Sequence, residues 1–196
     1  MSTLSETPTP NGDDDFPDDK SPAERREWWD GLGGERRQEF LEIAPDLIGN
    51  LDGIPSQVRD AANRAYLPVL IDSLAQQSGD DARTKLDGLR AIEDEINKPT
   101  IPQTYLLGIG DEGTGRAIVA YGNPDTSQHV HVPKPEGGFT AGAVRRALST
   151  AIGARGDDAS SASIVWLATD TERKTPAYAE FLSGLAATNT AGDQSP

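Results

Sequence analysis

Two histidines stand two positions apart in a short β-rich run, and they are the residues most suited to metal chemistry. His129 and His131 alternate with Val130 and Val132, so both rings fall on one face of a strand. A closed zinc site needs four ligands, and the chain has no other histidine and no cysteine. Carboxylates could complete such a site, but none stands at a ligand spacing. We therefore expect no metal and no other cofactor.

A glycine-rich segment, Gly110–Gly115, invites a phosphate-binding interpretation, because Gly113 and Gly115 let a ligand approach the backbone closely. The segment also holds two acids, which repel anions. No helical pattern follows it, so the amide cluster and helix dipole that hold a phosphate are missing. Because β-rich runs flank it at Tyr105–Ile109 and Ala117–Tyr121, we predict a hairpin turn.

The stretch Ile48–Arg64 concentrates hydrogen-bonding side chains. Its first part is a turn, and its second part reads as a helix that begins at Pro55, where a missing N–H costs nothing. The turn contains Gly49, Asn50, Asp52 and Gly53, and the helix carries Arg59, Asp60, Asn63 and Arg64. These helical side chains could tie a loop to a neighbouring domain. Spacing alone favours a solvated face with i,i+4 pairs.

Length and charge narrow the class of protein. The 196 residues suffice for one domain with a real core, and a hydrophobic content of 35% indicates that part of the chain is disordered. A net charge of −14 argues against nucleic acid and anionic membranes as partners. Without cysteine there is no disulfide and no Cys nucleophile. No leader or long apolar run is present, so we expect a cytoplasmic protein, although signal-independent export leaves no such trace.

The N-terminal part predicts a tail followed by helices. Residues 1–20 hold six acids against one lysine, so we expect a disordered acidic tail. Ser21–Glu24 reads as a capping box with proline at the first helical position. The helix that it starts carries Trp28 and Trp29, whose indoles we expect to anchor it by burial. Residues 21–98 read as a helical N-terminal region.

Pro68 lies inside the helical pattern that continues from Ile48–Arg64. Proline lacks an N–H and clashes with the carbonyl four residues back, so we predict a kink or break near Leu67. A further amphipathic pattern follows and ends before Pro99.

After this helical region the spacing of apolar residues changes from that of helices to short runs typical of strands. The expected strands are Tyr105–Ile109, Ala117–Tyr121, His129–Val132 and Ser163–Leu167, with helices at Val144–Ile152 and from Thr175 onward. This order implies a sheet that is antiparallel at its start and parallel afterwards. Residues 99–187 therefore read as a small sheet region, and residues 188–196 as a second disordered tail.

Several of these segments together resemble an actinobacterial α/β-hydrolase-like family of largely undefined substrate. They are Trp28-Trp29, Ile48–Arg64, Tyr105–Leu107, Gly115–Ala117 and Gly122–Thr126. The resemblance runs from about Glu27 to Leu185 and covers only the front portion of that family's domain. It implies a structural role for the motif residues Trp28, Trp29, Gly49, Asn50, Asp52, Gly53, Pro55, Arg59, Asp60, Asn63 and Arg64.

The chain departs from the family where the hydrolase chemistry should lie. It contains no G-x-S-x-G, the elbow that carries the nucleophile in that fold. The loop after the third strand normally supplies an oxyanion-hole N–H, and its equivalent here is Pro135, Glu136, Gly137 and Gly138. Family members are similar to His-Val-Ala-Val-Leu-Val-Pro-Gly-Thr-Gly in this region. Here Pro133 cuts the strand short, and Glu136 replaces the first glycine, where a carboxylate would oppose a developing oxyanion.

We therefore expect an α/β (α+β-like) fold: a helical N-terminal layer plus a small mixed sheet with flanking helices, resembling the first half of an α/β hydrolase. We expect no catalytic activity of its own. The alternatives are an active esterase-like hydrolase, half of a split hydrolase completed by another chain, or a helical export-linked module suggested by Trp29-Asp30-Gly31. Without the strand that carries the nucleophile, strand 129–132 would lie at the edge of the sheet. This edge would be either exposed or paired with a protein partner or a second copy.

Overall fold

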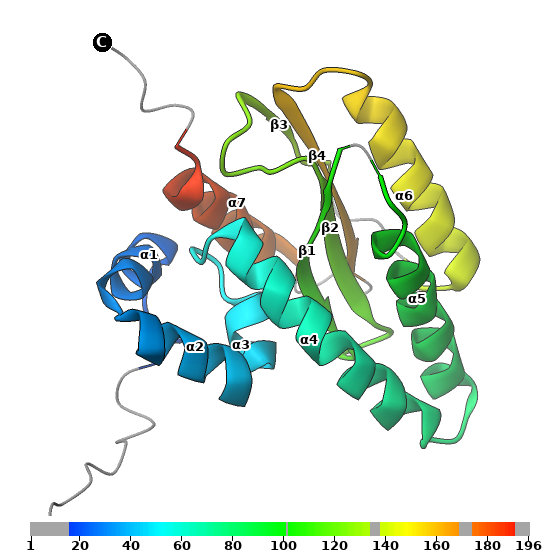
Figure 1. Cartoon of the computed structure of the whole chain (residues 1–196). Coiled ribbons are helices and arrows are strands. Elements are labelled where there is room, and N and C mark those ends of the chain that lie inside the picture. Colours follow the sequence, from blue (N-terminus) through cyan, green and yellow to red (C-terminus); the bar gives the residue numbers. More distant parts are fainter. Residues whose placement is uncertain (1–15, 101, 134–137, 169–173, 191–196) are drawn as a thin grey trace, which may run out of the picture.

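A four-stranded mixed sheet forms the centre of the fold, and helices cover both of its faces (Figure 1). The computed structural model describes residues 16–100, 102–133, 138–168 and 174–190. The helices are α1 (Pro22–Gly31), α2 (Gly34–Ile43), α3 (Pro45–Asn50), α4 (Ser56–Ala75), α5 (Asp80–Ile96), α6 (Ala141–Arg155) and α7 (Lys174–Thr188). The strands are β1 (Thr104–Gly110), β2 (Arg116–Tyr121), β3 (His129–His131) and β4 (Ser161–Ala168). None of the described helices is both long and apolar enough to cross a membrane.

The strands lie in the order β1-β2-β4-β3. Strand β2 pairs antiparallel with β1 and with β4, whereas β3 runs parallel to β4. The predicted hairpin and the predicted mixed sheet are therefore confirmed. Strand β3 is one residue shorter than expected, and it lies at the edge of the sheet, paired only with β4.

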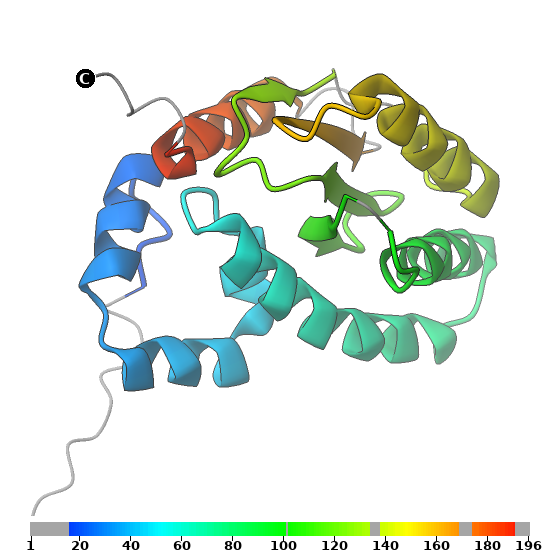
Figure 2. The ribbon, with the colours of Figure 1, turned by 45° about the horizontal axis from the view of Figure 1, so that its top comes forward.

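Alternation along β4 sends its side chains into two separate apolar clusters. Val165 and Leu167 pack with α5 and α6 on one face of the sheet, and Ile164 and Trp166 pack with α7 on the other. Figures 1 and 2 show α7 on the opposite side of the sheet from α5 and α6. All four side chains are at most 5% exposed. A strand buried on both faces reads as a continuous apolar run, which is why this one is visible in the sequence.

Helix α4 runs through Pro68 without a break. Of the kink or break predicted near Leu67, the break is therefore wrong. Pro68 lies on the exposed side of the helix, where water can hydrate the carbonyl that loses its N–H partner. On the opposite side Leu67, Leu70 and Leu74 are each at most 3% exposed in the core, and this burial stabilises the helix on both sides of Pro68.

The carboxylate of Asp125 caps the N-terminus of α4 from a distant part of the chain. Its two oxygens accept hydrogen bonds from the N–H of Ser56 at 2.6 Å and from the Ser56 hydroxyl at 2.8 Å. The carbonyl of Asp125 accepts from the N–H of Thr190 at 2.8 Å. The C-terminal tail expected from residue 188 onward is therefore tied to the fold as far as Thr190, because its backbone finds an acceptor there.

Helix α1 begins with the predicted capping box. The hydroxyl of Ser21 accepts a hydrogen bond from the N–H of Glu24 at 3.3 Å, and the Glu24 carboxylate accepts from the N–H of Ser21 at 2.9 Å. These hydrogen bonds from Ser21 lower the pKa of the Glu24 carboxyl. Two otherwise unpaired N–H groups at the helix start are satisfied in this way.

The residues just before α1 contact the helical layer. The ring of Phe16 packs edge-on against Trp28 with centroids 5.9 Å apart. The carbonyls of Pro17 and Asp18 accept hydrogen bonds from the guanidinium of Arg25 at 3.0 and 2.6 Å. The acidic tail expected from composition therefore does not extend to the capping box, because an aromatic ring and two carbonyls find partners here.

A chain that begins at Ser21 is expected to be less stable than one that begins at Phe16. The shorter chain loses the Phe16 ring contact and leaves Arg25, which is 7% exposed, without two acceptors. A buried donor without an acceptor costs about 1–3 kcal/mol. We expect the free energy of unfolding, measured by denaturant titration, to differ by at least about 1 kcal/mol. Equal stability of the two chains would show that these contacts contribute nothing.

Candidate functional site

Helix α4 binds the open edge of strand β1 through two polar side chains. Asp60 Oδ1 accepts a hydrogen bond from the N–H of Leu106 at 2.7 Å, and Asn63 Nδ2 donates to the Leu106 carbonyl at 2.9 Å. The same Asn63 amide donates to the carbonyl of Gly49 at 2.7 Å, and Asp60 also pairs with Arg64 at 2.8 Å. Asn63 is fully buried. The two side chains satisfy the backbone of an edge strand as a neighbouring strand would.

Asn50 and Arg64 extend this contact along β1. Asn50 Oδ1 accepts hydrogen bonds from the N–H of Ile109 at 3.0 Å and from the guanidinium of Arg116 at 3.2 Å. Arg64 donates to the carbonyl of Thr104 at 3.2 Å. The polar stretch therefore ties α4 and the end of α3 to the sheet, so its side chains do not form only a solvated face with i,i+4 pairs.

Two glycines before α4 permit close backbone approach, Gly49 inside α3 and Gly53 in the turn that follows it. The turn expected from Ile48 onward therefore begins only after Asn50, because Ile48–Asn50 are the last residues of α3. A Cβ at Gly49 would overlap the side-chain oxygen of Asn63. Gly53 has φ +99°, and a Cβ there would overlap the carbonyl oxygen of Pro22 at the start of α1. Only glycine fits these positions without displacing its neighbours.

Arg59 and Asp52 form a buried ion pair between the same turn and helix. Their side chains lie 2.9 Å apart and are 5% and 16% exposed. Arg59 also donates to the carbonyl of Gly49 at 3.2 Å, and its guanidinium lies 5.7 Å from the ring centroid of Phe181. Burial raises the pKa of Asp52 and lowers that of Arg59, and the partner's charge opposes each change. Burial of this kind in a cleft is typical of both structural and functional pairs.

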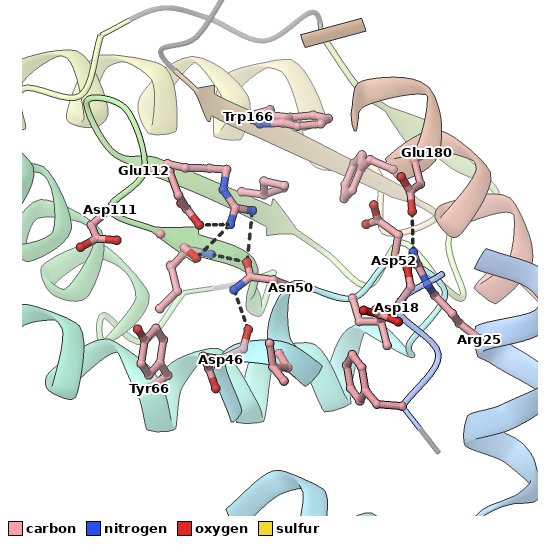
Figure 3. Close-up of a pocket in the computed structure, with 18 residues that line it drawn as sticks. Asp18, Arg25, Asp46, Asn50, Asp52, Tyr66, Asp111, Glu112, Trp166 and Glu180 are labelled. Carbon is pink, nitrogen blue, oxygen red and sulfur yellow. Dashed lines mark hydrogen bonds and ion pairs between the residues drawn. The ribbon is translucent and has the colours of Figure 1, made fainter. Parts of the chain in front are cut away.

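A cavity of about 500 Å³ opens beside this pair (Figure 3). It lies at the end of the sheet where the C-termini of β1 and β4 are found. Its carboxylates are Asp18, Asp46, Asp52, Asp111, Glu112 and Glu180, and its cations are Arg25 and Arg116. Its aromatic side chains are Phe16, Tyr66, Trp166 and Phe181. The carboxyl ends of strands are a common position for ligand sites, and the volume suits a small ligand or a peptide segment.

The two histidines lie on the opposite side of the sheet from the cavity, on edge strand β3. His129 and His131 are exposed, whereas Val130 packs with the α7 cluster. Strand β3 is therefore buried on one face only, as its alternation predicts. Within the described parts of the chain, no three His, Asp or Glu side chains gather where they could hold a metal.

The loop equivalent to the oxyanion loop falls largely outside the described residues. Pro135, Glu136 and Gly137 are not among them, and Gly138 has φ +98°. Thr140 then caps α6, because its hydroxyl accepts a hydrogen bond from the N–H of Ala143 at 3.2 Å.

The tryptophan pair packs inside the N-terminal helical layer. Trp29 is 3% exposed, and its ring lies 6.1 Å from that of the half-buried Trp28, which in turn contacts Phe40 at 5.2 Å. Helix α1 ends at Gly31 and α2 begins at Gly34, but the two helices run in different directions (Figure 2). The segment Trp29-Asp30-Gly31, which suggested an export-linked module, therefore does not join two antiparallel helices.

Sequence reasoning missed the cavity because its walls come from separate elements. Trp166 reads as part of a buried strand, and Arg25 and Glu180 read as ordinary helical surface, although they form an ion pair across α1 and α7. Asp125 was also missed, and here a signal existed, since it belongs to one of the segments that resemble the hydrolase-like family.

Comparison with known proteins finds relatives but assigns no activity. No protein-family model matches the chain, and no solved structure matches it. Two Mycobacterium tuberculosis proteins are similar to it: the uncharacterized protein Rv2079 of strain ATCC 25618 / H37Rv and the uncharacterized protein MT2140 of strain CDC 1551 / Oshkosh. Each is 31% identical over 137 residues, which cover 55% of this chain and 21% of the relative. The chain therefore spans about a fifth of the length of these relatives.

Proposed function

We propose that this chain is an α/β-hydrolase-like module without serine-hydrolase activity of its own, and that its β3 edge accepts a strand from another polypeptide segment. The strand order β1-β2-β4-β3, with β3 at the edge, carries the proposal. The resemblance to α/β hydrolases implies this order for the first four strands. It also implies that the strand delivering the nucleophile lies beside the third.

The chemistry of the β3 edge suits such a partner. Only three residues of β3 pair with β4, and the side chains of His129 and His131 are exposed. Ile152 of α6, on the face to which these histidines belong, is 39% exposed. An added strand would bond to the unpaired backbone of β3, and the segment after it could cover this face.

The sequence and the relatives support the same proposal. The 196 residues contain no G-x-S-x-G. In the two mycobacterial relatives the matched region makes up 21% of the protein, so other sequence accompanies it there. A net charge of −14 favours a protein segment over nucleic acid as the partner.

Amide hydrogen exchange followed by NMR tests whether the edge is open. In a strand paired on one side, only alternate N–H groups are bonded, so some amides of His129–His131 should exchange without protection while interior amides of β2 stay protected. Sedimentation on the same sample should show a monomer. Full protection of every β3 amide in a monomer would contradict the proposal.

The variant His131→Val tests why the edge stays unpaired in the isolated chain. A β-branched apolar residue in place of an exposed imidazole removes one of the features that blunt an edge strand. We expect the variant to self-associate with rising concentration while the parent chain does not. Val69→Thr, a change to another exposed side chain away from β3, is the matched control and should leave the chain monomeric.

A further inference from the structure

The acidic cavity has two separate ends (Figure 3). At one end Asp46, Asp111 and Glu112 lie around Tyr66, where burial and then these three carboxylates raise the pKa of the Tyr66 hydroxyl. At the other end lie Asp18, Asp52 and Glu180, close to α1 and α7. The cavity therefore presents negative charge at two points rather than at one.

The cations in and around the cavity are already engaged. Arg25 pairs with Glu180 at 2.5 Å, and Arg116 lies 3.5 Å from Glu112. Arg59 pairs with Asp52 from behind the wall. Asp18, Asp46 and Asp111 form no ion pair with any residue in the described part of the chain. Among the described residues, each end of the cavity therefore keeps at least one carboxylate without an ion-pair partner.

The wall between the two ends is apolar and aromatic, and one buried donor in it has no partner among the described residues. The rings of Trp166 and Phe181 pack edge-on with centroids 5.1 Å apart, and Ile118 lies beside them in the wall. Trp166 is 5% exposed, and its Nε1–H donates to no residue that the structure describes. A buried donor of this kind is rare and favours a ligand that brings an acceptor. At the rim Leu47 is 50% exposed, which suits contact with a larger partner.

We propose that this cavity binds an extended basic peptide segment with two cationic side chains. One cationic side chain reaches Asp111 and its neighbours, and the other reaches Asp18 and its neighbours. The backbone between them lies over the aromatic wall, and a carbonyl accepts from Trp166 Nε1 when binding displaces the side chains that now cover this atom. This binding is independent of the β3 edge and of any hydrolase relationship.

Charge complementarity favours a cationic peptide over an anion and over an uncharged peptide. An anion would meet an excess of carboxylates, and an uncharged peptide would leave them without partners. A free polyamine would match both ends but offers the indole N–H no carbonyl. Binding at carboxylates that are open to solvent should weaken as salt is added.

Isothermal titration of the full chain with the peptide acetyl-Lys-Ala-Lys-amide tests the proposal. We expect 1:1 binding at low salt, and none with the same peptide acetylated on both lysine side chains. The double variant Asp18→Asn/Asp111→Asn removes one unpaired carboxylate from each end, and it should bind about tenfold more weakly. Asp87→Asn/Asp157→Asn, an equal charge change at exposed acids outside the cavity, should bind as the parent chain does.

Two further measurements separate the occupants. Trp166→Phe keeps a ring and removes the N–H, so it should weaken the peptide about threefold or more, with thermal melting to confirm folding. Spermidine should bind more weakly than the peptide. The proposal is overturned if the peptide does not bind, if both double variants lose binding equally, or if spermidine binds as tightly as the peptide.

Discussion

Asn63→Asp is expected to lower the free energy of unfolding by about 4 kcal/mol at neutral pH, or to prevent folding. The substitution keeps the shape of the side chain and replaces its amide donor with a carboxylate oxygen. That oxygen would then face the carbonyls of Leu106 and Gly49, which now accept from Asn63 at 2.9 and 2.7 Å. It would also bring a second carboxylate to the Leu106 backbone beside Asp60. Denaturant titration measures the loss.

Two companion variants show whether the β1 edge contact is the cause. Asn63→Ala, which removes the donor without adding charge, should cost less, about 2 kcal/mol. The loss for Asn63→Asp should shrink as pH falls through the range where carboxyls protonate, since a protonated carboxyl regains a donor. Asn97→Asp, at an exposed helix end, is the matched control and should change stability by about 0.5 kcal/mol or less. If Asn63→Asp and Asn97→Asp lowered the free energy of unfolding equally, the contact of Asn63 with the β1 edge would not explain the loss.

Asp125→Ala is expected to cost about 2–3 kcal/mol, because it removes a helix cap and leaves buried donors unpaired. The carboxylate now accepts hydrogen bonds from both the N–H and the hydroxyl of Ser56. Its negative charge also interacts favourably with the positive N-terminal end of the α4 dipole. Asp125→Asn keeps one acceptor oxygen and loses the charge, so it should cost about half as much.

The control for the cap is Asp157→Ala in the exposed loop between α6 and β4, which should be nearly neutral. Far-UV circular dichroism of the Asp125 variants should show that the helices are kept at low temperature. If Asp125→Ala melted with the parent chain, capping of α4 by this residue would be without energetic importance.

Local patterns predicted most of the elements, and the reason is visible in particular residues. The hairpin follows from two apolar runs around Gly113 and Gly115, which have φ +59° and +106° in the turn. The capping box at Ser21–Glu24 needs only residues three positions apart. The break predicted near Leu67 was wrong because the proline rule considers the helix alone, whereas α4 is continuous and its Leu67 and Leu70 are buried in the core.

The site could not be predicted, because its contacts join residues far apart in the chain. Asn63 meets Leu106 across 43 positions, and Ser56 meets Asp125 across 69. No periodicity records such pairs. The resemblance to the hydrolase-like family marked both segments without indicating that they cap a strand and a helix. The cavity is even harder to predict from local patterns, since Arg25 and Glu180, which both line it, are 155 positions apart.

Labelling with a fluorophosphonate probe tests most directly the claim that this chain has no serine-hydrolase activity of its own. The probe forms a covalent bond with a serine that a neighbouring base has activated. An active serine hydrolase treated in parallel shows that the probe works, and heat-denatured protein gives the background. We predict no labelling of the native chain above that background at any serine. Stoichiometric labelling of one serine, lost on denaturation, would contradict the account.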